Sequence, residues 1–192
     1  AVEGFVPIIK EIRQAIEERG VPVGHEQQQA MAEAMLPKLK KWYEAQEHLL
    51  DALQPLLSQP AGPQGYRRNL IYKDPQERFI ILNHRFGPQG TPVHFHGDRE
   101  EGYKMALILN LEDGLIEEQF EVVEEDWPWV RLRSKGANAV ARGEIGYLTE
   151  KVGTPHRVWT DGRQVGVVEI YPPAPHKMER ATPRANDSDW HL

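Results

Sequence analysis

The segment "GTPVHFH" (residues 90–96) carries two histidines, one residue apart, behind a Gly-Thr-Pro lead-in. In an extended strand, residues i and i+2 point to the same face, so His94 and His96 project together while Phe95 points the other way. Two imidazoles placed in this way can bind one metal ion. Such a pair is common on its own, however, and two strand histidines beside the charged turn "GDREE" (97–101) would give the same pattern.

A second segment strengthens the metal interpretation. "GTPHRVW" (153–159) again leads through Gly-Thr-Pro into a stretch that carries a histidine, His156. Proline suits the first residue of a strand, where no donor to the neighbouring strand is needed. The two motifs therefore predict two strands, roughly sixty residues apart, that each begin in the same way and each present histidine.

The sequence before these motifs has the residue pattern of helices, whereas the sequence around them has the pattern of strands. Residues 1–60 show the apolar spacing of helices, with Gly20 as a helix end and Pro37 in the first turn of a second helix. The linker "SQPAGPQG" (58–65) then breaks the pattern.

The rest of the chain has a strand pattern. An all-β sandwich or barrel is indicated by eight short β-rich runs: "YRRNLIYK" (66–73), "ERFIILNHRF" (77–86), "YKMALILNL" (103–111), "IEEQFEVVEE" (116–125), "WVRLR" (129–133), "IGYLTE" (145–150), "HRVWT" (156–160) and "QVGVVEIY" (164–171). We therefore expect a barrel domain at 61–192 that ends in an irregular strap, with a helical extension at 1–60 packed on the barrel.

Composition narrows the classes of function. A net charge of −6 without a basic stripe argues against nucleic-acid binding. No apolar run approaches the roughly 20 residues that cross a bilayer, so no membrane partner is expected. Cysteine is absent, so a metal would have to be held by histidine and carboxylates. We expect a cytoplasmic protein, a monomer or homodimer, whose partners are small molecules.

The two histidine motifs within an all-β pattern resemble the two metal motifs of the cupin superfamily. The resemblance implies a mainly β fold, the cupin double-stranded β-helix or jelly-roll barrel, here with an N-terminal α-helical extension. It also implies a metal at the barrel mouth, held by His94, His96 and His156. Glu101 stands at a spacing where many cupins have a fourth, carboxylate ligand, and Glu100 is the alternative.

Residues 66 to about 175 are similar to one cupin branch, the cysteine dioxygenase-type thiol dioxygenases. That resemblance implies Fe(II) on the three histidines. Arg68 matches the family arginine that binds the substrate carboxylate, a task that suits a planar guanidinium, and Tyr66 lies beside it. Tyr171 matches the tyrosine whose phenol points at the metal-bound ligands, and Tyr103 is a further candidate for substrate binding. The motifs that carry the resemblance are "YRRNL" (66–70), "FGPQGTPVHFH" (86–96), "HRV" (156–158) and "YPP" (171–173).

The chain departs from that family at two places. The family strand usually carries Ser, His and Tyr at alternate inward positions, where this chain has Val167, Glu169 and Tyr171. Glu169 is therefore either a catalytic base or a buried carboxylate paired with Tyr171 or with an arginine. The cysteine that crosslinks to the tyrosine in some members is absent, and its place falls at or beside Glu101. If Glu101 binds the metal, about two of six octahedral positions stay open, too few for a chelating aminothiol plus O2.

Three functions remain open on these observations. The first is a non-haem iron dioxygenase that oxidises a small thiol, such as a thiol carboxylic acid, to its sulfinate with O2. The second is a cupin metalloenzyme with a three-His, one-Glu site that acts on a non-thiol substrate as a C–C-cleaving dioxygenase, isomerase or hydrolase. The third is a non-catalytic metal-binding cupin. Fe(II) is the expected metal, and Zn, Ni or Mn are alternatives because imidazole binds all of them.

Overall fold

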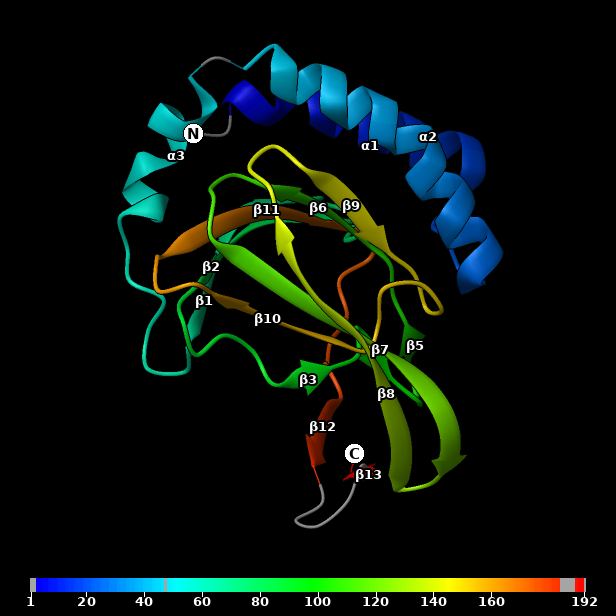
Figure 1. Ribbon diagram of the computed structural model, residues 1–192. Coiled ribbons are helices and arrows are strands. Elements are labelled where there is room, and N and C mark those ends of the chain that lie inside the picture. Colours follow the sequence, from blue (N-terminus) through cyan, green and yellow to red (C-terminus); the bar gives the residue numbers. More distant parts are fainter. Residues whose placement is uncertain (1–2, 47, 184–188, 192) are drawn as a thin grey trace.

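Helices precede the strands and arch over one face of the barrel (Figure 1). The structure is a computed structural model that describes residues 3–46, 48–183 and 189–191. The helical part comprises a 3-10 helix (Glu3–Phe5), α1 (Val6–Arg19), α2 (Gly24–Glu44) and α3 (Leu49–Leu57). In that described part of the chain, no helix is long and apolar enough to cross a membrane.

The helix boundaries confirm one expectation and correct another. α1 ends before Gly20, whose φ of 79° is easy for glycine and whose N–H donates to the carbonyl of Ile16. Pro37, expected in a first turn, lies instead inside α2, which starts at Gly24. The apolar stripe of α2 begins well before the proline, with Met31 already buried, so packing continues the helix through it.

The strands form two curled antiparallel sheets. The first has five strands in the order β1 (Tyr66–Lys73), β2 (Ile80–Phe86), β11 (Val165–Tyr171), β6 (Ala106–Asn110) and β9 (Ile145–Leu148). The second runs in the order β10 (His156–Thr160), β3 (Val93–His94), β12 (Arg180–Pro183), β13 (Asp189–His191), β8 (Trp129–Val140) and β7 (Leu115–Asp126). A small ladder joins β4 (Gly97–Asp98) and β5 (Gly102–Tyr103). This confirms the predicted mainly β barrel with N-terminal helices.

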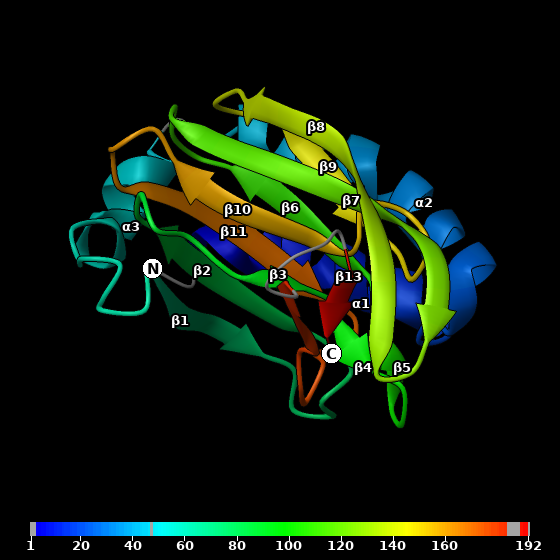
Figure 2. The same cartoon turned by 60° about the horizontal axis from the view of Figure 1, so that its bottom comes forward.

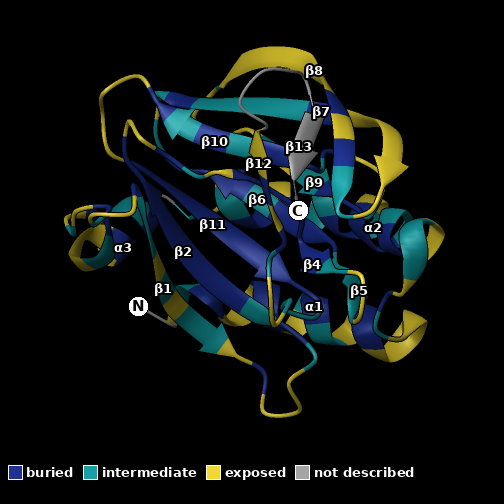
Figure 3. Ribbon diagram, turned by 90° about the horizontal axis from the view of Figure 1, so that it is seen from below, coloured by how far each residue is buried: buried dark blue, intermediate teal, exposed yellow. Residues whose placement is uncertain are grey.

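Strand β11 connects the helices to the barrel interior. All of its residues are buried (Figure 3). Val168 and Ile170 face the apolar core that the sheet shares with the helices, and the alternate residues Val167, Glu169 and Tyr171 face the barrel interior. The strand is thus apolar on one face and partly polar on the other, although both faces are buried.

The C-terminal strap is more regular than expected. β12 pairs with β3, and the register places Arg180 opposite His94. β13 pairs with both β12 and β8 (Figure 2). The strap therefore carries residues to the edge of the predicted metal site. Three short ladders fix it where the proline-rich composition predicted an irregular segment.

The turn between β1 and β2 contains a buried acid, Asp74. Its side chain is 1% exposed and accepts hydrogen bonds from the backbone N–H and the Nε of Arg78, at 3.1 and 2.8 Å. Arg13 of α1 lies 3.7 Å away. The hydrogen bond from the Arg78 side chain lowers the pKa of Asp74 below its ordinary value of 3.8, against an opposing effect of burial.

We predict that Asp74→Asn lowers the free energy of unfolding by about 2 kcal/mol at neutral pH, because two arginines lose a buried charged partner. The native contribution is present above the unfolded-state pKa and is lost as the pH falls towards the lower folded-state pKa. Urea titrations at pH 7 and pH 3 measure the difference. Glu77→Gln, in the same turn but 73% exposed, is the control and leaves the midpoint unchanged. An equal loss in both variants would contradict this account.

Candidate metal centre

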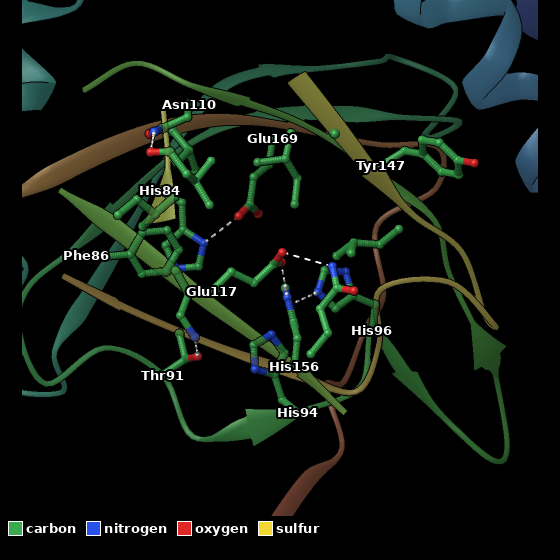
Figure 4. Close-up of a pocket in the computed structure, with 18 of the residues that line it drawn as sticks. His84, Phe86, Thr91, His94, His96, Asn110, Glu117, Tyr147, His156 and Glu169 are labelled. Atoms are coloured by element: carbon green, nitrogen blue, oxygen red, sulfur yellow. Dashed lines mark hydrogen bonds and ion pairs between the residues drawn. The ribbon is translucent and has the colours of Figure 1, made fainter. Parts of the chain in front are cut away.

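Three histidines meet where β3 and β10 pair. His94 and His156 are direct partners in the antiparallel register, and His96 follows β3 by two residues. One ring nitrogen of each lies within 4.8 Å of the others, and all three residues are buried. The three residues predicted from the sequence are therefore brought together (Figure 4).

The spacing of these nitrogens fits a transition metal. The Nε2 atoms of His96 and His156 are 3.1 Å apart. Bonds of about 2.0–2.1 Å, opened by roughly 90–110° at the metal, put neighbouring ligand nitrogens about 2.9–3.4 Å apart. The donor set, three imidazoles without thiolate, suits Fe, Zn, Ni, Cu or Mn.

The outer ring nitrogens of two histidines are held by acceptors. His94 Nδ1 donates to the carbonyl of Pro92 at 2.9 Å, and His156 Nδ1 donates to a carboxylate oxygen of Glu117 at 2.8 Å. Because each acceptor requires the proton on Nδ1, the Nε2 lone pair is left for the metal. The Nδ1 of His96 is buried without a partner among the described residues.

The electrostatics keep these imidazoles in the form that binds metal. Burial lowers the pKa of His94 and of His96, and the neighbouring His156 lowers both further, so that the pKa of His96 falls to about 3. Burial raises the pKa of Glu117, but the hydrogen bond from His156 and their mutual attraction lower it by more. The site thus combines two histidines, His94 and His96, that are kept neutral with an ionised carboxylate that contacts His156.

Glu101, the predicted fourth ligand, lies outside this group. Its carboxylate accepts the backbone N–H groups of His176 and Lys177 at 3.2 and 3.1 Å. Glu100 is exposed. The carboxylate that reaches the histidines is Glu117 of β7, which the sequence analysis missed. The one sequence feature that could have indicated Glu117 is that it lies on the inward face of its strand. Which face is inward depends on the pairing of Glu117 with Val158.

An inner cavity of about 130 Å³ opens beside the histidines. Its polar wall includes Glu169, which accepts hydrogen bonds from His84 Nδ1 at 3.1 Å and from the Tyr171 hydroxyl. Tyr171, expected to point at metal-bound ligands, thus directs its hydroxyl to Glu169, and its ring lies 5.6 Å from that of His96. The rest of the wall is mainly apolar, with Phe86, Ile108, Leu115, Val140, Val158 and Val167.

Glu169 stays ionised in this setting. Burial raises its pKa, but the attraction of His84 and the hydrogen bonds from His84 and Tyr171 lower it by more, to well below the ordinary value. Its partners are therefore Tyr171, one of the residues considered from the sequence, and His84 of β2. No arginine lines the cavity within the described part of the chain.

The three residues predicted to bind substrate lie outside the inner cavity. Arg68 donates to the sulfur of Met178, and the Tyr66 hydroxyl accepts from Arg180 at 2.7 Å. Tyr103 donates to Glu179, and burial followed by that neighbouring carboxylate raises the pKa of Tyr103 to about 12. The first two border a second pocket at the surface, which we call the cationic pocket, lined by Gln64, Tyr66, Arg67, Arg68, Pro175, His176, Lys177, Met178 and Arg180.

A small third pocket lies between the other two. It shares His84, His94 and Thr91 with the inner cavity, shares Arg68 with the cationic pocket, and shares Met178 with both. Arg68 is near enough to influence the pKa of the inner residues His96 and Tyr171. The arginine therefore stands at the approach to the metal centre, outside the space beside the histidines.

We predict that Glu117→Gln weakens metal binding about tenfold or more, because the hydrogen bond that orients His156 loses its charge. Competition with a chromophoric chelator measures the affinity for Zn(II) and Fe(II). Glu101→Gln is the matched control and leaves the affinity unchanged. The reverse order of the two variants would identify Glu101 as the ligand that the sequence predicted and would remove Glu117 from the metal centre.

The similarity of this chain to known proteins is confined to solved structures. No protein-family model and no curated protein matches the chain. Solved structures similar to it include polyketide cyclase RemF from Streptomyces resistomycificus (18% identity, 67% of this chain and 79% of that chain, TM-score 0.41). Others are an RmlC-like cupin protein from Desulfovibrio desulfuricans (20%, 60% and 91%, 0.38) and a cupin 2 domain-containing protein from Halorhodospira halophila (12%, 67% and 77%, 0.43). These likenesses concern the fold alone and carry no argument about activity.

Proposed function

We propose that the protein is a non-haem Fe(II) dioxygenase that oxidises a small thiol carboxylic acid to its sulfinate with O2. The observation that carries the proposal is the convergence of three buried imidazoles on one point beside the inner cavity. Such a group holds a transition metal while leaving positions for substrate and O2. Bound Fe(II) would supply the electron transfer that allows O2 to react with a substrate held next to it.

The position of Glu101 supports a site with room for both a thiol and O2. Three histidines leave about three of six octahedral positions open. Glu101 is engaged by the backbone N–H groups of residues 176 and 177, so we expect no carboxylate ligand from that position to compete for them. A thiol sulfur and O2 can then bind together while the carboxylate of the same substrate lies elsewhere.

The cationic pocket supports an acidic substrate. Arg67 donates to a glutamine, Arg68 to the Met178 sulfur and Arg180 to the Tyr66 hydroxyl. None of these three guanidiniums is paired with a carboxylate within the described residues, although the chain as a whole carries a net charge of −6. We assign Arg68 to the substrate carboxylate, with Tyr66 orienting Arg180 beside it. Tyr103 is tied to Glu179 and is left without a substrate role.

A second candidate is a cupin metalloenzyme acting on a non-thiol substrate, such as a C–C-cleaving dioxygenase of a β-diketone. The apolar wall of the inner cavity favours it, because Phe86, Leu115 and Val167 offer no partner to a charged group. The same fold with Zn could run an isomerisation or hydrolysis. Metal binding without turnover of any substrate would leave the third function, a non-catalytic metal-binding cupin.

We predict O2 uptake by Fe(II)-reconstituted protein with 3-mercaptopropionate or mercaptosuccinate, with sulfinate as the product. An oxygen electrode and mass spectrometry of the product measure it across these thiols, cysteine, cysteamine and a β-diketone. His96→Ala, which removes a ligand, abolishes uptake. Uptake with the β-diketone alone would establish the second candidate, and a fully iron-loaded protein that consumes no O2 with any compound would leave metal binding without turnover.

We also predict that Arg68→Ala raises KM for the thiol carboxylic acids about tenfold or more, because a charge-assisted hydrogen bond to the carboxylate is lost. Cysteamine, which has a thiol but no carboxylate, is the matched control substrate, and its KM stays unchanged. Arg67→Ala lies in the same pocket but does not border the small pocket that leads inward, so it has the weaker effect. An equal rise for cysteamine would show a general defect of the site.

A further inference from the structure

His84 is a buried imidazole with one ring nitrogen engaged and the other free. It lies on β2, 4% exposed, with its ring 4.2 Å from that of Phe86 and 5.6 Å from that of Tyr66 (Figure 4). Nδ1 is 3.1 Å from a carboxylate oxygen of Glu169. Nε2 is buried and has no hydrogen-bond partner among the described residues. The two aromatic rings and the carboxylate together fix the orientation of the imidazole.

The hydrogen bond to Glu169 decides the tautomer. An ionised carboxylate only accepts, so the proton of His84 sits on Nδ1, and in the neutral imidazole Nε2 presents a lone pair. The second oxygen of Glu169 accepts the Tyr171 hydroxyl. Tyr171 therefore holds the carboxylate, and the carboxylate holds the imidazole, as in other carboxylate–histidine pairs that transfer protons.

His84 lies where its free nitrogen can contact a ligand. His84 lines both the inner cavity and the small pocket between that cavity and the cationic pocket. A ligand that passes from Arg68 towards the three metal-binding histidines therefore meets His84. A buried polar atom without a partner is unfavourable, so a ligand group that shares a proton with Nε2 would be stabilised there.

A carboxylate lies against the ring of His84. Glu169 of β11 carries a negative charge that would pair with a proton received by the imidazole. The other groups that face this region are the hydroxyls of Tyr66 and Tyr171, the guanidiniums of Arg68 and Arg180, and the imidazoles of His94 and His96. Among these groups Glu169 is the one in hydrogen-bond contact with the His84 ring.

We propose that His84 is the general base of the inner cavity, which takes the proton of the acidic S–H or O–H group of a ligand on its way to the metal centre. The bond between that proton and the ligand heteroatom breaks, the heteroatom keeps the electron pair, and the proton bonds to Nε2. Nδ1–H stays on the imidazole and keeps its hydrogen bond to Glu169. Glu169 and Tyr171 are then positioning residues, while His84 touches the ligand. The choice of a thiol as ligand rests on the proposed function, but the proton transfer does not require oxidation.

The test measures how many protons are released to the buffer when a ligand binds, under conditions without turnover. Protein loaded with redox-inert Zn(II) is titrated by calorimetry with 3-mercaptopropionate, and separately with acetohydroxamate, in buffers of different ionisation enthalpy. The pH is about 7.5, below the ordinary thiol pKa of about 8.5, so the free thiol carries its proton. The wild type releases close to no protons to the buffer, because His84 keeps the proton, whereas His84→Gln releases about one per bound ligand.

His48→Gln makes the same chemical change at an exposed histidine that borders none of the three pockets, so it is the matched control and behaves as the wild type does. The thermal midpoint and the Zn content of each variant establish that the fold and the metal site are intact. Equal proton release by the wild type and His84→Gln would overturn the inference, as would failure of both probes to bind. If the wild type retains the proton but the Fe(II) protein takes up no O2, His84 is confirmed as the base. Only the thiol dioxygenase function is then overturned.

Discussion

Removal from water is the constraint on which the interior of this barrel depends. A buried polar group is costly unless another group satisfies it. The interior nevertheless lines its cavity with four imidazoles and the carboxylate of Glu169. His94 and His156 give their outer protons to Pro92 and Glu117, which leaves their inner nitrogens directed at one point. Among the described residues, the buried Nε2 of His84 has no partner, and it borders the space where a ligand would complete the structure.

The helical extension takes part in holding this arrangement. Gln28 of α2 is buried, donates to the carbonyl of Tyr103 and accepts the backbone N–H of Glu150. His25 contacts Thr149, just before the second histidine motif. α2 is thus bound to the segments that flank His96 and His156, in addition to its apolar contact with the sheet. The extension and the barrel share one core, so the metal-binding strands are fixed from outside the barrel as well as from within it.

Local patterns were enough to predict the strands and the three histidines. All eight β-rich runs contain a strand, and the Gly-Thr-Pro lead-ins located His94, His96 and His156 because a strand start and a period of two are local features. The two-residue strand β4 carries too little pattern to be found. The proline-rich strap was underestimated for a different reason, because its regularity comes from pairing with distant strands.

The partners of the histidines could not be read from the sequence, because they depend on register between distant strands. Glu117 meets His156 because β7 and β10 pair with Val158 opposite Glu117. His84 reaches Glu169 across β2 and β11, although the direct partner of His84 in that register is Val167. A shift of one residue in either ladder would turn these side chains to the other face. Glu101 illustrates the converse, since its spacing matched a ligand while its backbone partners placed it elsewhere.

The distribution of charge along the approach to the metal centre follows one order. Arginines that have no carboxylate partner in the described part of the chain lie at the surface. An imidazole lies behind them, and carboxylates lie around the three metal-binding histidines. A divalent ion on those histidines would bring two positive charges, which Glu117 and Glu169 would balance. An anionic substrate would then find little net attraction at the metal itself and would depend on the arginines to hold its acidic end. The reacting group would have to shed its proton before it carried charge inward, which is the step that a base at the position of His84 serves. Binding at the cationic pocket and proton transfer in the small pocket are therefore consecutive requirements of the same charge distribution.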